Sequence, residues 1–223
     1  MTRSVWTPLA LALLSFSGLA LARSGVPAQQ SRQDAVRVTA FSQGIFRLTA
    51  GRLSSTVNLR DQIEGCTSGI YDLTDPKSRP SGGEADTRVL DLVKKNGAWY
   101  LTFQATLNSG CNVQGTCGAG TDTTLVWLKL TPALKVVAKQ AEMIEDCVAN
   151  VTIDQYTGMK TGATVSYETP PYVTLLELRG GRLEVVSVKH GYDGKTDTLT
   201  TVRYQHAFPE KGLSMSSRQV AQK

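Results

Sequence analysis

The clearest pattern along the chain is the alternation of apolar and polar residues in WYLTFQATL, residues 99–107. One side of an extended strand would carry Trp99, Leu101, Phe103, Ala105 and Leu107. A period of two is typical of a β-strand with a buried face. Asn96-Gly97, just before it, is a favoured two-residue turn. Residues 88–103, RVLDLVKKNGAWYLTF, therefore predict a β-hairpin.

A second hairpin is predicted in TLLELRGGRLEVV, residues 174–186, which is nearly symmetric about Gly180-Gly181. Two glycines can adopt the positive φ angles of a tight two-residue turn. Pairing outward from this turn sets Arg179 opposite Arg182 and places leucines together on one face. Charged residues then share the other face, as expected for a half-buried antiparallel sheet.

Further segments are rich in threonine, valine and aromatic residues, and turn signals separate them at intervals of about ten residues. These expected strands are 36–41, 44–50, 125–130, 163–168 and 198–208. The pattern predicts an all-β fold, an antiparallel β-sandwich or open barrel of roughly ten or more strands.

Residues 133–147, ALKVVAKQAEMIEDC, fit this pattern least well. They are good helix formers with apolar positions at helical spacing, and Thr131-Pro132 would suit a helix start. A strand is preferred, because the neighbouring segment 125–130 then has a hairpin partner. The sequence leaves helix and strand both open here.

The amino terminus has the features of a secretory signal peptide. Arg3 is followed by an apolar run that is too short for a membrane span and that ends in Ala20-Leu21-Ala22. The expected organisation is a signal peptide at 1–22, a flexible leader at 23–34, a single β domain at 35–209 and a flexible tail at 210–223. The expected location is the periplasm or the extracellular space.

Composition excludes some classes of partner. The formal net charge is +5, and the basic residues are scattered, with Lys94-Lys95 the only adjacent pair. A nucleic-acid-binding domain usually gathers its basic residues on one face, so no nucleic acid is expected. No second apolar run of membrane length follows the signal, so the mature chain is not expected to be an integral membrane protein. The expected partner is an unknown envelope or extracellular ligand.

The four cysteines are Cys66, Cys111, Cys117 and Cys147. An even number in an exported chain is most simply two disulfides, because export leads to an oxidising compartment. The spacing of Cys111 and Cys117 fits neither a redox C-x-x-C motif nor a typical zinc site. We therefore expect a disulfide-stapled fold without a metal or another cofactor.

The pairing of these cysteines has alternatives. If the chain turned after residue 130 with Leu130 opposite Leu134, the same register would bring Cys117 opposite Cys147 and leave Cys66 with Cys111. We prefer this scheme, which requires a strand after Pro132. Of the three possible connectivities, another joins Cys111 to Cys117 in a local loop and leaves Cys66 with Cys147.

The strongest candidate for a ligand site is the loop HGYDGKTDT, with His190, Tyr192 and Asp193 as possible ligand-binding residues. Asp193-Gly194 is also ordinary turn chemistry, and the spacing of the aspartates falls short of a calcium loop. Glu142, Glu145 and Asp146 form a second acidic group, more simply interpreted as a solvated face.

The sequence favours a binding or interaction module without catalysis, whose loops at 73–87, 108–122 and 191–197 form the working surface. The Gly-rich phosphate loop, the G-x-S-x-G elbow and the H-E-x-x-H motif are absent from the sequence. One alternative is a secreted hydrolase of a polymer that uses His190 with Asp193, or the Glu142 group, as acid and base. Another is a structural envelope protein.

Overall fold

The structure is a computed structural model that describes residues 36–42, 44–62, 86–108, 121–147, 149–159 and 174–222. The predicted signal peptide, leader and strand at 163–168 lie outside these residues, as do Cys66, Cys111 and Cys117. The loop 73–85 and most of the loop after residue 108 also lie outside.

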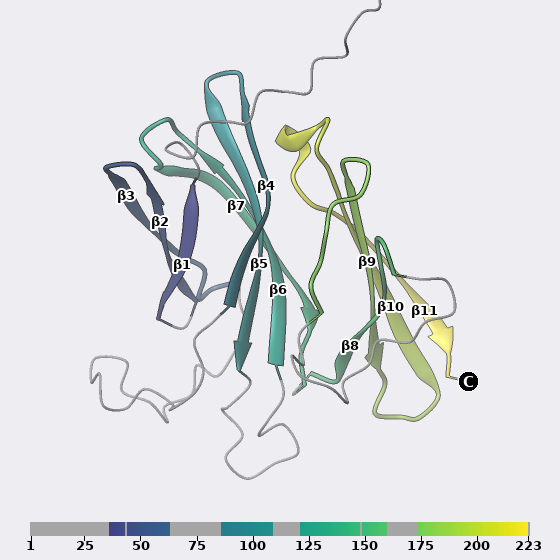
Figure 1. Ribbon diagram of the computed structural model, residues 1–223. Coiled ribbons are helices and arrows are strands. Elements are labelled where there is room, and N and C mark those ends of the chain that lie inside the picture. The colour runs from purple at the N-terminus through teal and green to yellow at the C-terminus, as the bar shows by residue number, and fades with distance from the viewer. Residues whose placement is uncertain are drawn as a thin grey trace, which may run out of the picture. The chain divides into compact units, whose positions relative to one another are not determined.

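The described residues form eleven strands in three antiparallel sheets (Figure 1). The N-terminal sheet contains β1 (Arg37–Ser42), β2 (Ile45–Ala50) and β3 (Leu53–Asn58) in that order. The central sheet contains β4 (Asp86–Lys95), β5 (Ala98–Asn108), β6 (Thr121–Leu130) and β7 (Val136–Glu145). The C-terminal sheet has the order β11-β10-β9-β8, built from β8 (Val151–Tyr156), β9 (Arg182–His190), β10 (Thr196–Gln205) and β11 (Ser214–Ala221).

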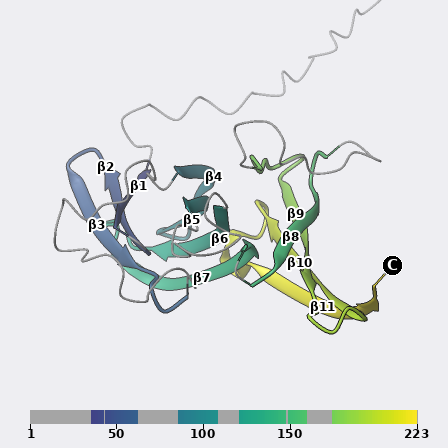
Figure 2. The same ribbon diagram turned by 90° about the horizontal axis from the view of Figure 1, so that it is seen from below.

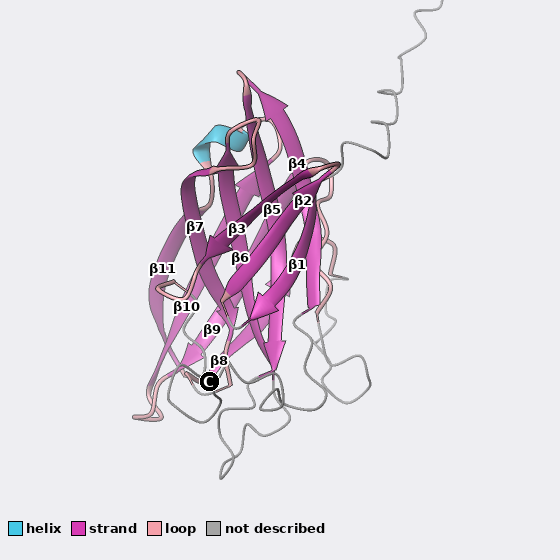
Figure 3. Ribbon diagram, turned by 90° about the vertical axis from the view of Figure 1, so that its left-hand side faces the viewer, coloured by secondary structure: helices cyan, strands magenta, loops and turns pink. Residues whose placement is uncertain are grey.

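The prediction of an all-β, antiparallel fold is confirmed. A single 3₁₀ turn, Pro209–Lys211, is the only helical element among the described residues (Figure 3). Within the same residues, no helix is long and apolar enough to cross a membrane.

The central sheet is buried on both of its faces. Six consecutive residues of β5, 101–106, and seven of β6, 122–128, are all buried. Because successive side chains of a strand point to opposite faces, such a run means that both faces are covered. The other two sheets provide this cover from opposite sides (Figure 2).

One core joins the central sheet to the N-terminal sheet. Phe46 of β2 meets Phe103 of β5 edge to face, with ring centroids 5.4 Å apart. This is a favourable arrangement of two aromatic quadrupoles. The buried residues of this core are Val36, Phe46, Leu48, Val57, Leu59, Leu101, Phe103, Ala105, Val126, Leu128, Leu130 and Leu134. The alternation predicted for residues 99–107 is thus confirmed at its apolar positions 101, 103 and 105.

A second core joins the central sheet to the C-terminal sheet. Tyr100 stacks on Trp127, and both pack in one cluster with residues of β8, β9 and β10. The buried members of the cluster are Tyr100, Leu125, Trp127, Ile144, Ile153, Leu176, Leu183, Val185, Val202, Tyr204 and Leu213. The Trp127 Nε1–H donates to the Pro209 carbonyl at 2.9 Å, which fixes the connection between β10 and β11.

Gln104 shows how a polar residue is accommodated between the sheets. Its amide nitrogen donates to the Thr174 carbonyl at 2.7 Å, and its amide oxygen accepts from the Leu176 N–H at 3.1 Å. The side chain therefore completes the backbone hydrogen bonds of a segment that belongs to no strand. Gln104 and the Leu176 N–H are buried, so these bonds satisfy the amide of Gln104 and a buried backbone donor.

The first predicted hairpin is confirmed, with one irregularity. Asn96 and Gly97 have φ angles of 52° and 74°, and β4 pairs with β5 around them. The pairing register shifts between Val89 and Asp91, which marks a β-bulge at Leu90.

The second predicted hairpin is confirmed only at its turn. Gly180 and Gly181 have positive φ angles, and Arg179 and Arg182 exchange two backbone hydrogen bonds across them. The pairing then stops, because the Glu184 N–H and carbonyl bond to Thr157 instead. Residues 174–178 leave β9 and lie along the central sheet at Gln104.

Residues 136–145 form the strand β7, so the preference for a strand over a helix is confirmed. The predicted register is wrong. Leu130 pairs with Val136, not with Leu134, because Leu134 lies in the turn with a φ of 60°. The register argument for pairing Cys117 with Cys147 therefore no longer holds, and Cys117 itself lies outside the described residues.

The prediction of a flexible tail at 210–223 is wrong for residues 214–221, which form β11. Apolar residues do not alternate there, and for this reason the sequence pattern missed the strand. Main-chain pairing with β10 and the Leu213 N–H bond to Gln140 Oε1, 2.7 Å, hold it in place. Gly212 has a φ of 68°, and a side chain there would collide with Gln140.

Replacing Gln104 with alanine should lower the free energy of unfolding by about 2–4 kcal/mol, because a buried backbone N–H and a half-buried carbonyl lose their partner. Urea denaturation measures this value. Gln155→Ala, at an exposed position of β8, is the control and should change it by less than about 0.5 kcal/mol. Equal effects of the two substitutions would contradict this role of Gln104.

Candidate functional site

The predicted ligand loop lies between β9 and β10. Its Asp193 side chain is engaged in hydrogen bonds within the turn itself. The Asp193 carboxylate accepts the backbone N–H groups of Lys195 at 2.9 Å and Thr196 at 3.1 Å. This is the ordinary capping role of an aspartate in a turn. Tyr192 is 84% exposed and points away from the core.

His190, at the end of β9, takes part in a small network on the face of the C-terminal sheet that points away from the central sheet. Its Nδ1 lies 3.3 Å from Asp197 Oδ2, and its Nε2 lies 3.4 Å from the Thr152 hydroxyl. The Gln222 amide donates to Asp197 Oδ1 at 2.6 Å. That hydrogen bond, followed by those of the Gly191 N–H and His190, lowers the pKa of Asp197. The network ties the end of β11 to the β9–β10 turn.

Of the three acidic residues predicted as a second group, Glu145 and Asp146 are buried at the end of β7, and Glu142 is partly buried. Glu145 accepts the Thr123 hydroxyl at 2.9 Å, and Asp146 accepts the Ala149 N–H at 2.9 Å. The third buried carboxylate beside them belongs to Asp122 of β6. The interpretation of 142, 145 and 146 as a solvated face is therefore wrong for Glu145 and Asp146.

Asp122 has the most perturbed acidity in this group. Burial, followed by the nearby charges of Asp146 and Glu145, raises its pKa to about 7. The backbone N–H of Cys147 partly opposes this shift. One carboxyl oxygen of Asp122, Oδ1, is buried without a hydrogen-bond partner among the described residues.

Asp91, Tyr204 and His206 form a contact between sheets that the sequence pattern missed. The Tyr204 hydroxyl donates to Asp91 Oδ2 at 2.7 Å, and His206 Nδ1 lies 2.9 Å from the same oxygen. Burial, followed by the hydrogen bond to Asp91, raises the pKa of the Tyr204 phenol, so it remains a donor. Asp91 belongs to the central sheet and Tyr204 to the C-terminal sheet, so the contact braces the two. The bulge at Leu90, which sets the register of Asp91, has no sequence signal of its own.

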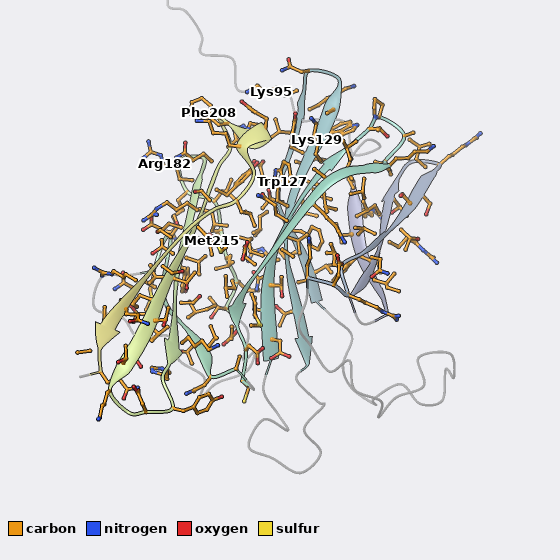
Figure 4. The ribbon with its side chains drawn as sticks, turned by 180° about the vertical axis from the view of Figure 1, so that it is seen from behind. Lys95, Trp127, Lys129, Arg182, Phe208 and Met215 are labelled. Atoms are coloured by element: carbon orange, nitrogen blue, oxygen red, sulfur yellow. The ribbon has the colours of Figure 1, made fainter. Side chains whose placement is uncertain are left out.

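The same end of the strands carries a second anchor. Lys95 Nζ donates to Glu210 Oε2 at 2.8 Å, next to Phe208 (Figure 4). The hydrogen bond of Lys95, followed by the local backbone, lowers the pKa of the Glu210 carboxyl. These contacts hold the segment that leads into β11.

An open depression of about 300 Å³ lies on the C-terminal sheet. It is lined by Leu199, Thr201, Arg203, Ser216, Ser217 and Arg218 of β10 and β11. Val202 and Tyr204 of β10 are buried toward the central sheet, so the alternating residues Leu199, Thr201 and Arg203 point away from it. The depression is therefore on the outer face.

Two arginines give this depression its charge. Arg203 Nε donates to Glu184 Oε2 at 2.6 Å, and Arg203 Nη1 donates to the Ser216 hydroxyl at 3.2 Å. Arg218 forms no hydrogen bond or ion pair with the described part of the chain. The arrangement can accept an anion, because a guanidinium with free N–H groups binds carboxylate or phosphate oxygens in pairs.

The described residues provide no evidence for metal chemistry: none of their histidine, cysteine and carboxylate side chains form a group of three placed to hold a metal ion. Cys147, the one cysteine among them, is not a free thiol.

Comparisons of the chain with models of known protein families, with curated proteins and with solved structures gave no match. The site must therefore be interpreted from its own geometry.

The raised pKa of Asp122 predicts a pH-dependent stability. The folded protein holds this proton up to about pH 7, whereas the unfolded chain loses it near pH 4. The contribution of Asp122 to the free energy of unfolding is therefore complete below about pH 4 and is lost as the pH rises through 7. Asp122→Asn should be more stable than the natural protein at pH 8, by up to about 4 kcal/mol, and nearly equal to it at acid pH.

Thermal unfolding of both proteins at the two pH values tests this expectation. Asp154→Asn, at an exposed position of β8, is the matched control and should show no such difference. A gain for Asp122→Asn that is the same at both pH values would rule out the proposed titration.

Proposed function

We propose that the chain is an exported binding module of the cell envelope or extracellular space, without catalysis, that holds an anionic ligand on the outer face of its C-terminal sheet. One observation carries the proposal: Arg218, whose guanidinium has no partner among the described residues, lines an open depression of about 300 Å³. This volume is at the lower end of the range of ligand sites.

The lining of the depression supports an anionic ligand. Arg218 supplies free donors, and Ser216 and Thr201 supply hydroxyl groups beside it. Part of the Arg203 charge is offset by Glu184, so Arg218 is the main uncompensated charge. Leu199 gives the depression an apolar side against which the carbon skeleton of a ligand can pack.

The hydrolase alternative has less support. Asp193 is engaged in its turn and Glu145 with Thr123, and neither lines the depression. An acid and a base that act together must converge on one substrate position. The alternative of a purely structural protein assigns no role to the depression.

Export and two disulfides remain part of the proposal. Cys147 is not a free thiol, which supports the disulfide part of the proposal. Peptide mapping by mass spectrometry of the unreduced mature protein should give two bridges, no free thiol and an amino terminus at Arg23. Two or more free thiols would contradict the disulfide part of the proposal.

Arg218→Ala should weaken binding of polygalacturonate, an acidic polysaccharide used as the probe, by about tenfold, because a charge-assisted contact is lost. Isothermal titration calorimetry measures the affinity. Arg52→Ala is the matched control: Arg52 is exposed in the β2–β3 turn, and the described residues offer it no ion pair. Equal losses in the two variants would mean that only net charge matters, and would contradict the proposed site.

A further inference from the structure

We infer that the free edge of β11 binds an extended, acidic segment of another polypeptide as a fifth strand of the C-terminal sheet. This inference rests on the proposed function, because it names the class of ligand that places its carboxylate at Arg218. Its basis is a comparison of all the sheet edges in the described residues.

Most of these edges carry features that prevent strand addition. The pairing of β4, β7 and β8 with their neighbours shows register shifts that mark bulges or irregularities. Bulges twist an edge and interrupt its row of backbone groups, and charged residues add to the protection. β4 and β7 also carry several charged side chains each.

The edges of the N-terminal sheet are partly occupied. β1 has a register shift after Ala40, and its Val38 carbonyl accepts the Thr87 hydroxyl at 2.8 Å. β3 pairs regularly but has only six residues, and its Asn58 carbonyl accepts Lys139 Nζ at 2.8 Å.

β11 has neither a bulge nor a run of charged residues. Its register with β10 is continuous from Ser214 to Ala221, without a bulge. Its sequence, SMSSRQVA, contains no proline and one charged residue, Arg218. Residues 214–219 are all exposed, and the strand lies at the end of its sheet. A regular exposed edge of eight residues is a template for another strand.

The orientation of the free backbone groups follows from one hydrogen bond. The Gln222 N–H donates to the Lys195 carbonyl at 2.9 Å, so these two residues form a hydrogen-bonded pair. Such pairs alternate along an antiparallel ladder. Residues 214, 216, 218 and 220 therefore direct their backbone groups to β10. The residues that direct theirs to the free edge are Met215, Ser217, Gln219 and Ala221. Met215, labelled near the start of β11 in Figure 4, has an exposed side chain.

Charge identifies the kind of segment that fits this edge. The side chain of Arg218 is on the outer face, where side chains of an added strand at the same level would be its neighbours. A carboxylate there would pair with the free guanidinium. A second copy of β11 fits less well, because the strand has no acidic residue to offer.

The test uses a capped peptide of about eight residues that alternates threonine and glutamate. Its control is the same peptide with N-methyl groups on alternate amides, which keeps the side chains but removes strand hydrogen bonds. Hydrogen exchange by NMR reports on each amide of β11. The peptide should slow exchange at 215, 217 and 219, whereas 216 and 218 should be protected already in the free protein.

A pair of variants separates the backbone from the side chain. Gln219→Pro removes an outward N–H without removing a bond to β10, and proline is tolerated at such edge positions. It should weaken peptide binding by about tenfold or more, whereas Gln219→Ala should change it by less than about twofold. Both variants should bind polygalacturonate as the natural protein does, because that probe needs no strand pairing.

The outcomes distinguish the two proposals. Strand addition is overturned if the peptide binds without protecting the amides of 215, 217 and 219. It is also overturned if the N-methylated peptide binds with equal affinity. In that case the loss of polygalacturonate binding in Arg218→Ala still supports the anion site. If Arg218→Ala changes neither probe more than Arg52→Ala does, the proposed function fails as well. Binding of a second copy, seen as concentration-dependent protection without peptide, would also overturn the inference.

Discussion

Burial of both faces of β5 and β6 is the constraint on which the rest of the structure depends. A sheet covered on both sides needs apolar residues at successive positions, and the chain supplies them only in part. The polar residues that remain in the core require partners, since an unpaired buried group costs about 1–3 kcal/mol. Gln104 meets this requirement with the backbone of residues 174–176, and Ser187 meets it by donating to the Ile144 carbonyl at 2.7 Å. These hydrogen bonds fix the position at which the C-terminal sheet packs. Apolar contacts alone would define that position less strictly.

This packing also determines which part of the C-terminal sheet remains exposed. The inner faces of β9 and β10 are used by the core, and the connection after β10 is held by Trp127 and Lys95. β11 follows from this anchored connection but contributes no residue to the buried clusters. A strand that is fixed in position yet contributes little to the core is free to carry a binding surface. The unpaired Arg218 and the regular free edge both belong to this strand.

The sequence predicted the local elements better than their assembly. Turn chemistry at Asn96-Gly97 and Gly180-Gly181 was sufficient to locate both turns, because positive φ angles depend on the residues themselves. The register of β7 was not predictable in the same way, because it depends on which of residues 131–135 adopts a positive φ angle in the turn. Leu134 takes it, and a leucine gives no sequence signal for a positive φ.

The candidate site was the least predictable part. His190 and Asp193 carry side chains capable of acid–base chemistry. Asp193 instead caps the β9–β10 turn, and His190 contacts Asp197, which accepts a hydrogen bond from Gln222. Arg218 lies in a segment without periodicity, and its significance depends on being unpaired beside a depression. Absence of a partner is a property of the assembled sheet. No pattern within SMSSRQVA could show it.

The most direct test of the central claim is a map of backbone chemical shifts with and without the acidic peptide. We expect the perturbed residues to form two adjacent rows, one on β11 and a weaker one on β10, with Arg218 near their centre. Perturbations that gather instead at the β9–β10 turn around His190 and Tyr192 would contradict it, and would return the binding surface to the loop that the sequence first favoured.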